Sequence, residues 1–178
     1  MDPDEALYAR VRRGDMRAFD ELYARYASRL YGFLFSILRN RADAEDVFHE
    51  AFMRALDARD VELRAGGFRA WLYRIARNCA LNVLRSRERG ARAVAAVPEA
   101  EPAARADERL EGKELDIALA GAVERLPPKL LELFHLRSTG MSYEDMAEVL
   151  ETPLGTIKSR MNQMVTTLRE EMKPWIAS

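Results

Sequence analysis

The sequence predicts an all-α protein made of two small helical domains joined by a flexible linker, and three observations lead to this fold class. Apolar residues recur at three- and four-residue intervals along most of the 178 residues, as they do in amphipathic helices. The alternation of Val, Ile and Thr that is typical of strands is absent. Between the two groups of helical segments lies an alanine-rich stretch with two prolines and alternating charge, residues 91–107, a composition typical of linkers.

The first domain, residues 1–92, is expected to be a bundle of three or four helices. A short helix is predicted around residues 6–13, and a long one follows an N-cap at Asp15. The next helix begins near Asp43, and the last follows the break at Gly66-Gly67. The three longer helices carry apolar stripes at Phe19, Leu22, Tyr23, Tyr26, Leu30, Phe33, Leu34 and Ile37; at Ala44, Val47, Phe48, Ala51, Phe52 and Ala55; and at Phe68, Leu72, Ile75, Ala76, Cys79 and Val83.

The second domain, residues 111–178, follows the linker at residues 93–110 and is expected to contain four helices. One ends at Leu126-Pro127-Pro128, and another covers about residues 129–137. Ser142 stands three residues before Asp145, as in a capping box, and starts a short helix. The last helix begins at Pro153, because a helix accepts proline at its first position, and its apolar stripe is Leu154, Ile157, Met161, Met164, Leu168 and Met172.

The last two helices have the lengths and the short turn of a helix-turn-helix. The apolar stripe leaves short polar and cationic side chains near the start of the final helix, where they suit base edges and phosphates in a major groove. These residues are Thr156, Lys158, Ser159, Arg160, Asn162 and Gln163. The alternative interpretation is an ordinary helical hairpin with a polar outer face.

The formal net charge of −1 argues, taken alone, against a nucleic-acid partner, but the charge is distributed unevenly. Residues 64–92 carry eight arginines and one acidic residue, a net charge of +7, whereas residues 1–63 and 93–124 carry −3 and −5 and residues 125–178 are balanced. Arginine suits phosphate oxygens and base edges, so the basic helix is a candidate nucleic-acid surface; a solvated helix face is the alternative. We expect a protein that binds DNA poorly by itself and needs a partner to place this surface.

Two aromatic residues, Trp71 and Tyr73, precede the polar side of the basic helix, on which Arg74, Arg77, Asn78 and Arg85 lie. Exposed aromatic rings beside cations can stack on unpaired bases. The alternative is that both rings belong to the core, and for Trp71 the core interpretation is favoured.

The helix before Gly66 has an acidic side, formed by Asp43, Glu45, Asp46 and Glu50. Asp46 and Glu50 are four residues apart and share a helix face, as an acid/base pair of a hydrolytic enzyme would. No nucleophile, glycine-rich phosphate loop or set of metal ligands accompanies them in the sequence. A protein-docking face is the better functional interpretation, and a solvated face is the other one.

The composition disfavours several functional classes. Cys79 is the single cysteine and His49 and His135 are the only histidines, so no disulfide framework, metal centre or cofactor is expected. No apolar run approaches the roughly 18 residues of a membrane span, and the acidic N-terminus lacks the apolar segment of a secretory signal. We expect a cytoplasmic protein that is not an enzyme.

Three segments of this chain resemble the bacterial extracytoplasmic-function (ECF) sigma factors, the small two-domain initiation subunits of RNA polymerase. Residues 18–23 (AFDELY) through 43–47 (DAEDV) are similar to the polymerase-binding part of region 2, and residues 68–78 (FRAWLYRIARN) to its promoter-melting and −10 segment. Residues 126–128 (LPP), 141–147 (MSYEDMA) and 155–160 (GTIKSR) resemble region 4. The order, the spacing and the position of the linker agree with the family.

The resemblance implies a sigma factor that directs core RNA polymerase to promoters and has no chemistry of its own. The region 2 domain would dock on polymerase through Asp43, Asp46 and Glu50. The −10 element would be held by Arg69, Trp71, Tyr73, Arg74, Arg77, Asn78 and Arg85, with the loop at about residues 60–67 around a flipped base. The −35 element would be contacted by Ser142, Thr156, Lys158, Ser159, Arg160 and Gln163. The implied partners are core polymerase, promoter DNA and an anti-sigma factor that wedges between the domains, with no membrane insertion.

Two departures from the family pattern bear on these roles. His49 stands where relatives usually have glutamine, next to the docking residues. After Arg160 relatives commonly carry more arginines, whereas residues 161–167 here have none; because each lost phosphate contact lowers affinity, we expect weak −35 binding by the second domain alone.

The alternative function is an autonomous helix-turn-helix regulator that binds duplex DNA without polymerase. The basic, aromatic segment at residues 68–78 disfavours this alternative, because a protein that binds only duplex DNA needs no melting surface.

Overall fold

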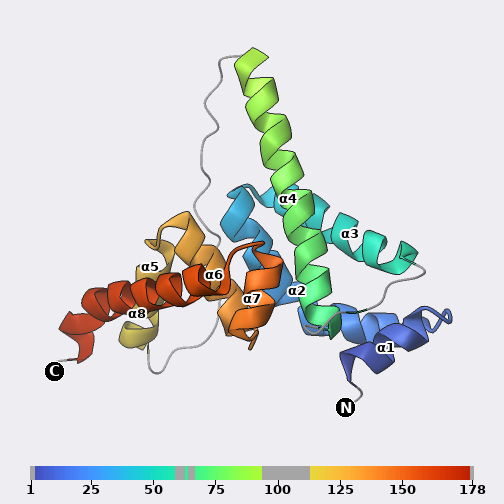
Figure 1. The fold of residues 1–178 in the computed structure, drawn as a ribbon, viewed down its shortest axis with the longest axis horizontal. Coiled ribbons are helices and arrows are strands. Elements are labelled where there is room, and N and C mark those ends of the chain that lie inside the picture. The colour runs from blue at the N-terminus through green and yellow to red at the C-terminus, as the bar shows by residue number, and fades with distance from the viewer. Residues whose placement is uncertain (1–2, 59–62, 64–66, 94–112, 177–178) are drawn as a thin grey trace.

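The computed structural model describes residues 3–58, 63, 67–93 and 113–176, and every element of regular structure in these residues is a helix (Figure 1). The predicted all-α class is therefore confirmed. The helices before the linker are α1 (Asp4–Val11), α2 (Met16–Leu38), α3 (Arg41–Asp57) and α4 (Gly67–Ala93). Those after it are α5 (Lys113–Glu124), α6 (Pro128–Ser138), α7 (Tyr143–Val149) and α8 (Leu154–Ile176). Residues 94–112, which include most of the predicted linker, lie outside the described residues.

Side chains at the predicted positions start two of these helices. Asp15 Oδ1 accepts hydrogen bonds from the backbone N–H groups of Arg17 and Ala18, at 3.0 and 3.3 Å. Ser142 and Asp145 form the predicted reciprocal capping box: Ser142 Oγ accepts from Asp145 N at 3.0 Å, and Asp145 Oδ2 accepts from Ser142 N at 3.1 Å. Each cap satisfies backbone donors that the first turn of a helix leaves unpaired.

The predicted boundary at the start of α8 is one residue early. The helix begins at Leu154, and the carbonyl of Pro153 accepts the N–H groups of Thr156 and Ile157 at 2.9 and 3.1 Å. Pro153 thus flanks the helix instead of occupying its first position.

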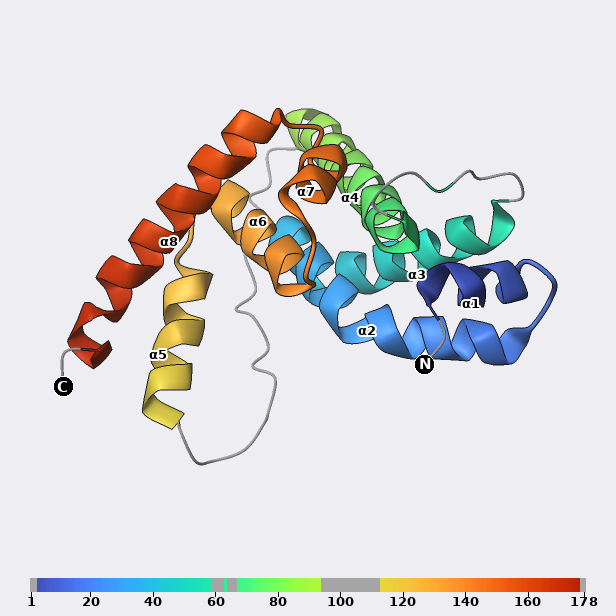
Figure 2. The same cartoon turned by 60° about the horizontal axis from the view of Figure 1, so that its bottom comes forward.

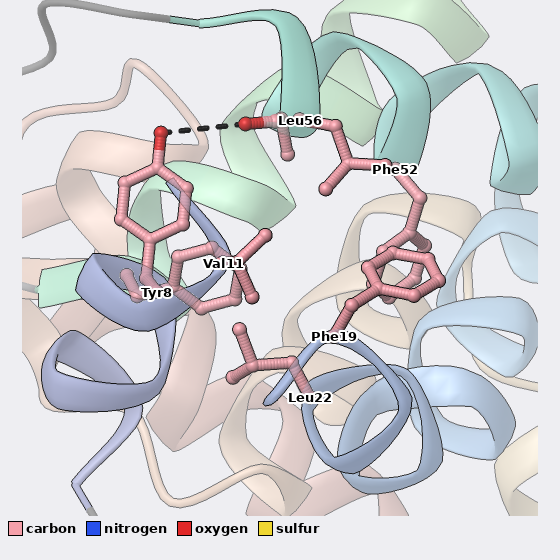
Figure 3. Close-up of a pocket in the computed structure, with 8 residues that line it drawn as sticks. Tyr8, Val11, Phe19, Leu22, Phe52 and Leu56 are labelled. Atoms are coloured by element: carbon pink, nitrogen blue, oxygen red, sulfur yellow. Dashed lines mark hydrogen bonds between the residues drawn. The ribbon is translucent and has the colours of Figure 1, made fainter. Parts of the chain in front are cut away.

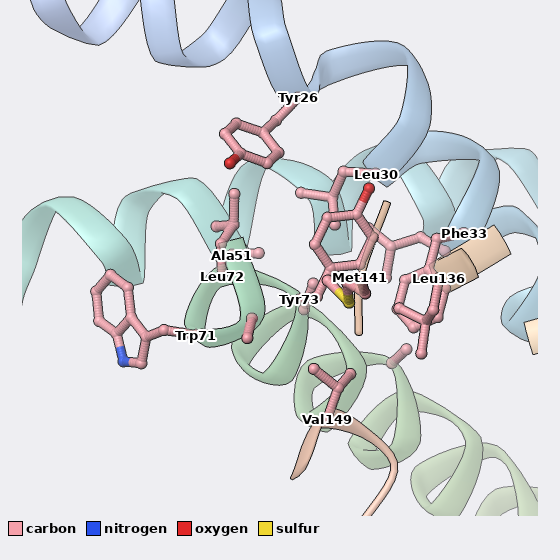
Figure 4. Close-up of a cluster of buried hydrophobic side chains, with 14 of the residues drawn as sticks. Tyr26, Leu30, Phe33, Ala51, Trp71, Leu72, Tyr73, Leu136, Met141 and Val149 are labelled. Carbon is pink, nitrogen blue, oxygen red and sulfur yellow. The ribbon is translucent and has the colours of Figure 1, made fainter. Parts of the chain in front are cut away.

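One continuous apolar core runs through both groups of helices. α6 packs against α2, and α7 packs against α4, and in Figure 2 α6 and α7 lie between α8 on one side and α4 on the other. Figure 4 shows side chains of this core from both groups, including Phe33 (α2), Tyr73 (α4), Leu136 (α6) and Val149 (α7), each 0 % exposed. The two predicted domains are therefore packed face to face.

The first four helices also have a closed core of their own. Figure 3 shows Tyr8, Phe19 and Phe52 around a cavity of only about 10 Å³, which is too small to hold more than a single water molecule. The Tyr8 hydroxyl donates to the carbonyl oxygens of Ala58 and Ala55, at 3.1 and 3.3 Å, and so ties α1 to the end of α3. This core offers no ligand site.

We predict that any residue other than glycine at position 67 lowers the stability of the protein. Gly67 has φ +64°, and a Cβ there would stand 2.2 Å from Glu5 Oε1, the atom that accepts the Phe68 N–H at 3.2 Å and so caps α4. We expect Gly67→Ala to lower the free energy of unfolding by about 1–2 kcal/mol, because the left-handed backbone is strained with a side chain and the cap is displaced. Urea unfolding measures this loss.

Gly155→Ala is the matched control, because no atom lies within 4 Å of a Cβ placed there. It should be neutral or stabilise the protein by up to about 1 kcal/mol. An equal loss in both variants would mean that the conformation of Gly67 is not the cause.

Candidate protein and nucleic-acid interfaces

The acidic side of α3 is exposed. Asp46 and Glu50 both face solvent, and Glu50 forms an ion pair with Arg54 one turn later at 2.6 Å. Asp43 differs from them: it is half-buried and pairs with Arg87 of α4, within the first group of helices. The structure thus brings together two of the three predicted docking residues on one open face, and it turns the third toward α4.

The basic side of α4 is covered by the second domain. Arg74 Nη1 donates to Glu148 Oε1 of α7 at 2.7 Å, and the two side chains are 27 % and 28 % exposed. Arg77 Nε donates to Glu132 Oε1 of α6 at 2.6 Å, and these side chains are only 15 % and 16 % exposed. Two arginines predicted to hold DNA are therefore engaged by carboxylates of the same chain.

Arg69, one turn earlier on α4, makes a third polar contact with the second domain. Its Nη1 donates to the carbonyl oxygen of Thr139 at 2.7 Å. Thr139 is buried, and it lies at the turn between α6 and α7, next to Gly140 at φ +82°.

Asn78 and Arg85, farther along α4, are exposed, and in Figure 1 the end of α4 extends beyond the packed helices.

Trp71 and Tyr73 are core residues in this structure. The ring of Trp71 packs against Tyr8 and Phe68, with centroids 5.3 and 5.9 Å apart, and the residue is 9 % exposed. Tyr73 is 0 % exposed, with its ring centroid 5.2 Å from that of Phe33. The core interpretation is therefore confirmed for Trp71. The alternative interpretation, in which the rings are open to stack on bases, does not hold for this arrangement, because tertiary packing covers both rings.

The start of α8 presents the predicted polar face. Lys158, Ser159 and Gln163 are exposed, whereas Thr156 and Arg160 are half-buried. The apolar stripe on the other side is buried as predicted, at Ile157, Met161, Met164 and Met172. Ser142 is also exposed, but its hydroxyl is occupied as the N-cap of α7. The helix-turn-helix thus leaves three candidate −35 residues open to solvent, whereas several candidate −10 residues on α4, at Trp71, Tyr73, Arg74 and Arg77, are covered.

Other predicted features lie outside the described residues or have no counterpart within them. Of the loop predicted to surround a flipped base, only Leu63 and Gly67 are described. In the described part of the chain, no group of three or more His, Cys, Asp or Glu side chains could hold a metal ion. Among the same residues, no helix is both long enough and apolar enough to cross a bilayer.

A cleft of about 400 Å³ opens between α2, α5 and α6, where the two domains meet. His135 of α6 lies in it, 3.7 Å from the position that a Cβ on Gly32 of α2 would take. The charged groups that line the same cleft are Arg39, Asp116 and Glu124. Burial, and after it the positive charge of Arg39, lower the pKa of His135 below its ordinary value.

This histidine predicts a pH dependence of stability. Below the ordinary pKa of about 6.5, the unfolded chain binds a proton at His135 more readily than the folded chain does, so the free energy of unfolding should fall as the pH falls through that value. His135→Gln should flatten this part of the profile in urea unfolding between pH 8 and 5. His49→Gln is the control, because His49 is the other histidine and is exposed; an identical profile in both variants would contradict the assignment.

Sequence reasoning missed the partners of the basic helix. Glu132 and Glu148 lie 55 and 74 residues from the arginines that they pair with, so no local pattern relates them. The only sequence feature that bears on these ion pairs is the presence of acidic residues among the balanced charges of residues 125–178. It does not indicate which carboxylates face α4.

Comparison with known proteins agrees with the two groups of helices. Residues 22–90 match the model of sigma-70 region 2, and residues 116–167 match that of sigma-70 region 4. The RNA polymerase sigma-H factor of Pseudomonas aeruginosa is 31% identical over 97% of this chain and 95% of its own length. The ECF RNA polymerase sigma-E factors of Haemophilus influenzae and Escherichia coli K12 are each 32% identical over 96% of their lengths. This chain belongs to the ECF sigma factors.

Two solved structures have the same fold as this ECF sigma factor. One is CnrH in complex with the cytosolic domain of CnrY, with a TM-score of 0.64 and 25% identity over 97% of this chain and 99% of that chain. The other is RpoE of Bartonella quintana in complex with the anti-sigma factor NepR, with a TM-score of 0.68 and 26% identity over 87% and 96%. The chain is thus an alternative sigma factor that directs transcription together with RNA polymerase.

Proposed function

We propose that the two domains of this ECF sigma factor divide promoter recognition between them. The region 2 domain, residues 1–92, docks on core polymerase through Asp46 and Glu50 and holds the −10 element with the arginines of α4. The region 4 domain, residues 111–178, contacts the −35 element through α8. The observation that supports this division best is the exposure of both surfaces, the acidic side of α3 and the polar start of α8, on helices that match regions 2 and 4.

In this proposal the protein carries out no chemical step. Asp46 and Glu50 are exposed on α3, and so are the two nearby residues His49 and Arg54, of which Arg54 pairs with Glu50. The exposed pair fits a contact surface, since small-molecule substrates bind in concave pockets that bury most of their surface. We place the protein in the cytoplasm, because core polymerase and promoter DNA are its partners there.

The experiment that tests the proposal is reconstituted transcription. The protein is added to purified core polymerase with a library of promoter fragments, and start-site-specific transcripts are sequenced. Transcripts that depend on the protein are expected. Binding to duplex DNA without co-elution with polymerase, and without transcripts, would instead support the autonomous helix-turn-helix regulator.

An anti-sigma factor is the third proposed partner. The similar RpoE structure holds an anti-sigma factor, and the closed arrangement of the two domains leaves apolar side chains of α5 exposed beside the cleft, at Leu115, Ile117 and Leu119. Addition of such an inhibitor to the transcription assay should abolish the transcripts. Continued transcription with an inhibitor that co-purifies with the protein would contradict this role.

A further inference from the structure

Within the described residues, three arginines proposed to hold DNA, Arg69, Arg74 and Arg77, make polar contacts with the region 4 domain. Arg74 and Arg77 are one turn apart on α4, and each meets a glutamate of the region 4 domain at 2.6–2.7 Å. The two carboxylates come from different helices, Glu132 from α6 and Glu148 from α7. The α6–α7 hairpin therefore presents a pair of negative charges that matches the spacing of the arginines.

A carboxylate in this position resembles a DNA phosphate chemically. Both groups offer anionic oxygens to a guanidinium group, and arginine binds both through charge-assisted hydrogen bonds. The Arg77–Glu132 pair is the more buried of the two, at about 15 % exposure, so solvent and salt screen it less than a surface pair. A DNA strand cannot reach Arg77 while Glu132 holds it.

We propose that in the free protein the region 4 domain closes over α4 and that Glu132 and Glu148 occupy the arginine sites that the −10 DNA would take. The inference rests on the proposed role of Arg74 and Arg77 in DNA binding. Promoter DNA and the α6–α7 hairpin then compete for the same two guanidinium groups. The free factor is closed to DNA without any inhibitor protein.

The closed arrangement also contains groups that favour opening. Tyr73 Oη is buried at the domain contact and has no hydrogen-bond partner among the described residues, and the same holds for Arg69 Nε. Buried polar atoms without partners oppose the state that buries them. Opening would return both atoms to water. Their burial therefore destabilises the closed state, whereas the two ion pairs stabilise it.

Closure covers only one of the three proposed contact surfaces. α3, with Asp46 and Glu50, lies on the side of α4 away from α7 in both views (Figures 1 and 2). Lys158 and Ser159 at the start of α8 are exposed in the closed state. Polymerase and −35 DNA can therefore engage the closed protein first, and their binding to separate domains would draw the two apart and release α4.

The test compares two double variants of the full chain that change the net charge equally. Glu132→Gln/Glu148→Gln removes both ion pairs and keeps the side-chain size, whereas Glu144→Gln/Glu170→Gln removes two exposed carboxylates of the same domain. The radius of gyration from small-angle X-ray scattering reports opening. The Kd for a fluorescein-labelled single-stranded oligonucleotide, without polymerase, reports access to α4.

We expect the Glu132→Gln/Glu148→Gln protein to expand and to bind the oligonucleotide about three- to tenfold more tightly than the wild type, the range expected from losing two ion pairs of this exposure. The control variant should change the Kd less than twofold. Equal radii and equal Kd values in the two double variants would overturn the proposal. Expansion without a gain in DNA affinity would also overturn it, because closure would then not compete with DNA.

Arg74→Ala/Arg77→Ala separates this inference from the proposed function on which it rests. This variant loses both the ion pairs and the DNA-binding groups, so it should expand but bind the oligonucleotide more weakly than the open Glu132→Gln/Glu148→Gln protein. Equal DNA binding by these two open variants would refute the DNA role of the arginines and leave their part in closure standing.

Discussion

Asp46→Arg/Glu50→Arg is expected to abolish binding to core polymerase while the protein stays folded. Both side chains are exposed on α3, and the helix is held by its opposite side, where Ala44, Val47 and Ala51 are at most 1 % exposed. Reversal of two charges on the proposed docking surface would replace attraction with repulsion, which costs several kcal/mol. We expect the Kd for core polymerase, measured by biolayer interferometry, to rise by at least about 100-fold.

Glu144→Arg/Glu170→Arg is the matched control for this charge reversal. Glu144 is exposed on α7 and Glu170 on α8, so the variant changes the net charge equally without altering the acidic side of α3. Its polymerase affinity should stay within about threefold of the wild type. Circular dichroism melting should show both double variants folded; a folded Asp46→Arg/Glu50→Arg protein with unchanged affinity would remove α3 from the docking surface.

Tyr73→Ala is expected to cause the largest loss of stability of any change considered, about 3–5 kcal/mol. The ring is 0 % exposed and lies within 5.2 Å of Phe33 and 6.4 Å of Tyr26, centroid to centroid. Removal of the ring leaves a cavity in the core that joins the two domains. Urea unfolding of the full chain measures the loss.

Tyr73→Phe separates the ring from its hydroxyl. Burial raises the pKa of Tyr73 far above its ordinary value, so the hydroxyl stays protonated, and it has no hydrogen-bond partner among the described residues. Removal of an unpaired buried hydroxyl should be neutral or stabilise the protein by about 1 kcal/mol. A loss of more than about 1 kcal/mol in Tyr73→Phe would mean that the hydroxyl has a partner in solution.

The local features of the fold could be predicted from the sequence because their causes are local. The N-cap at Asp15 and the capping box of Ser142 and Asp145 act within three residues, and the stripe from Ile157 to Met172 follows the helical repeat. The same periodicity placed Lys158, Ser159 and Gln163 on the exposed side of α8. The resemblance to ECF sigma factors added the order of the two domains.

Tertiary structure alone decided that the polar face of α4 is covered. Arg74 and Arg77 lie on a helix face that the sequence correctly identifies as polar, but a glutamate from a distant helix meets each of them. The burial of Tyr73 was also decided by tertiary structure, because it depends on packing in the core that joins both domains. A linear pattern specifies the face on which a side chain lies. It carries no information about which distant surface will cover that face, because that depends on the complementary shape and charge of residues more than 50 positions away.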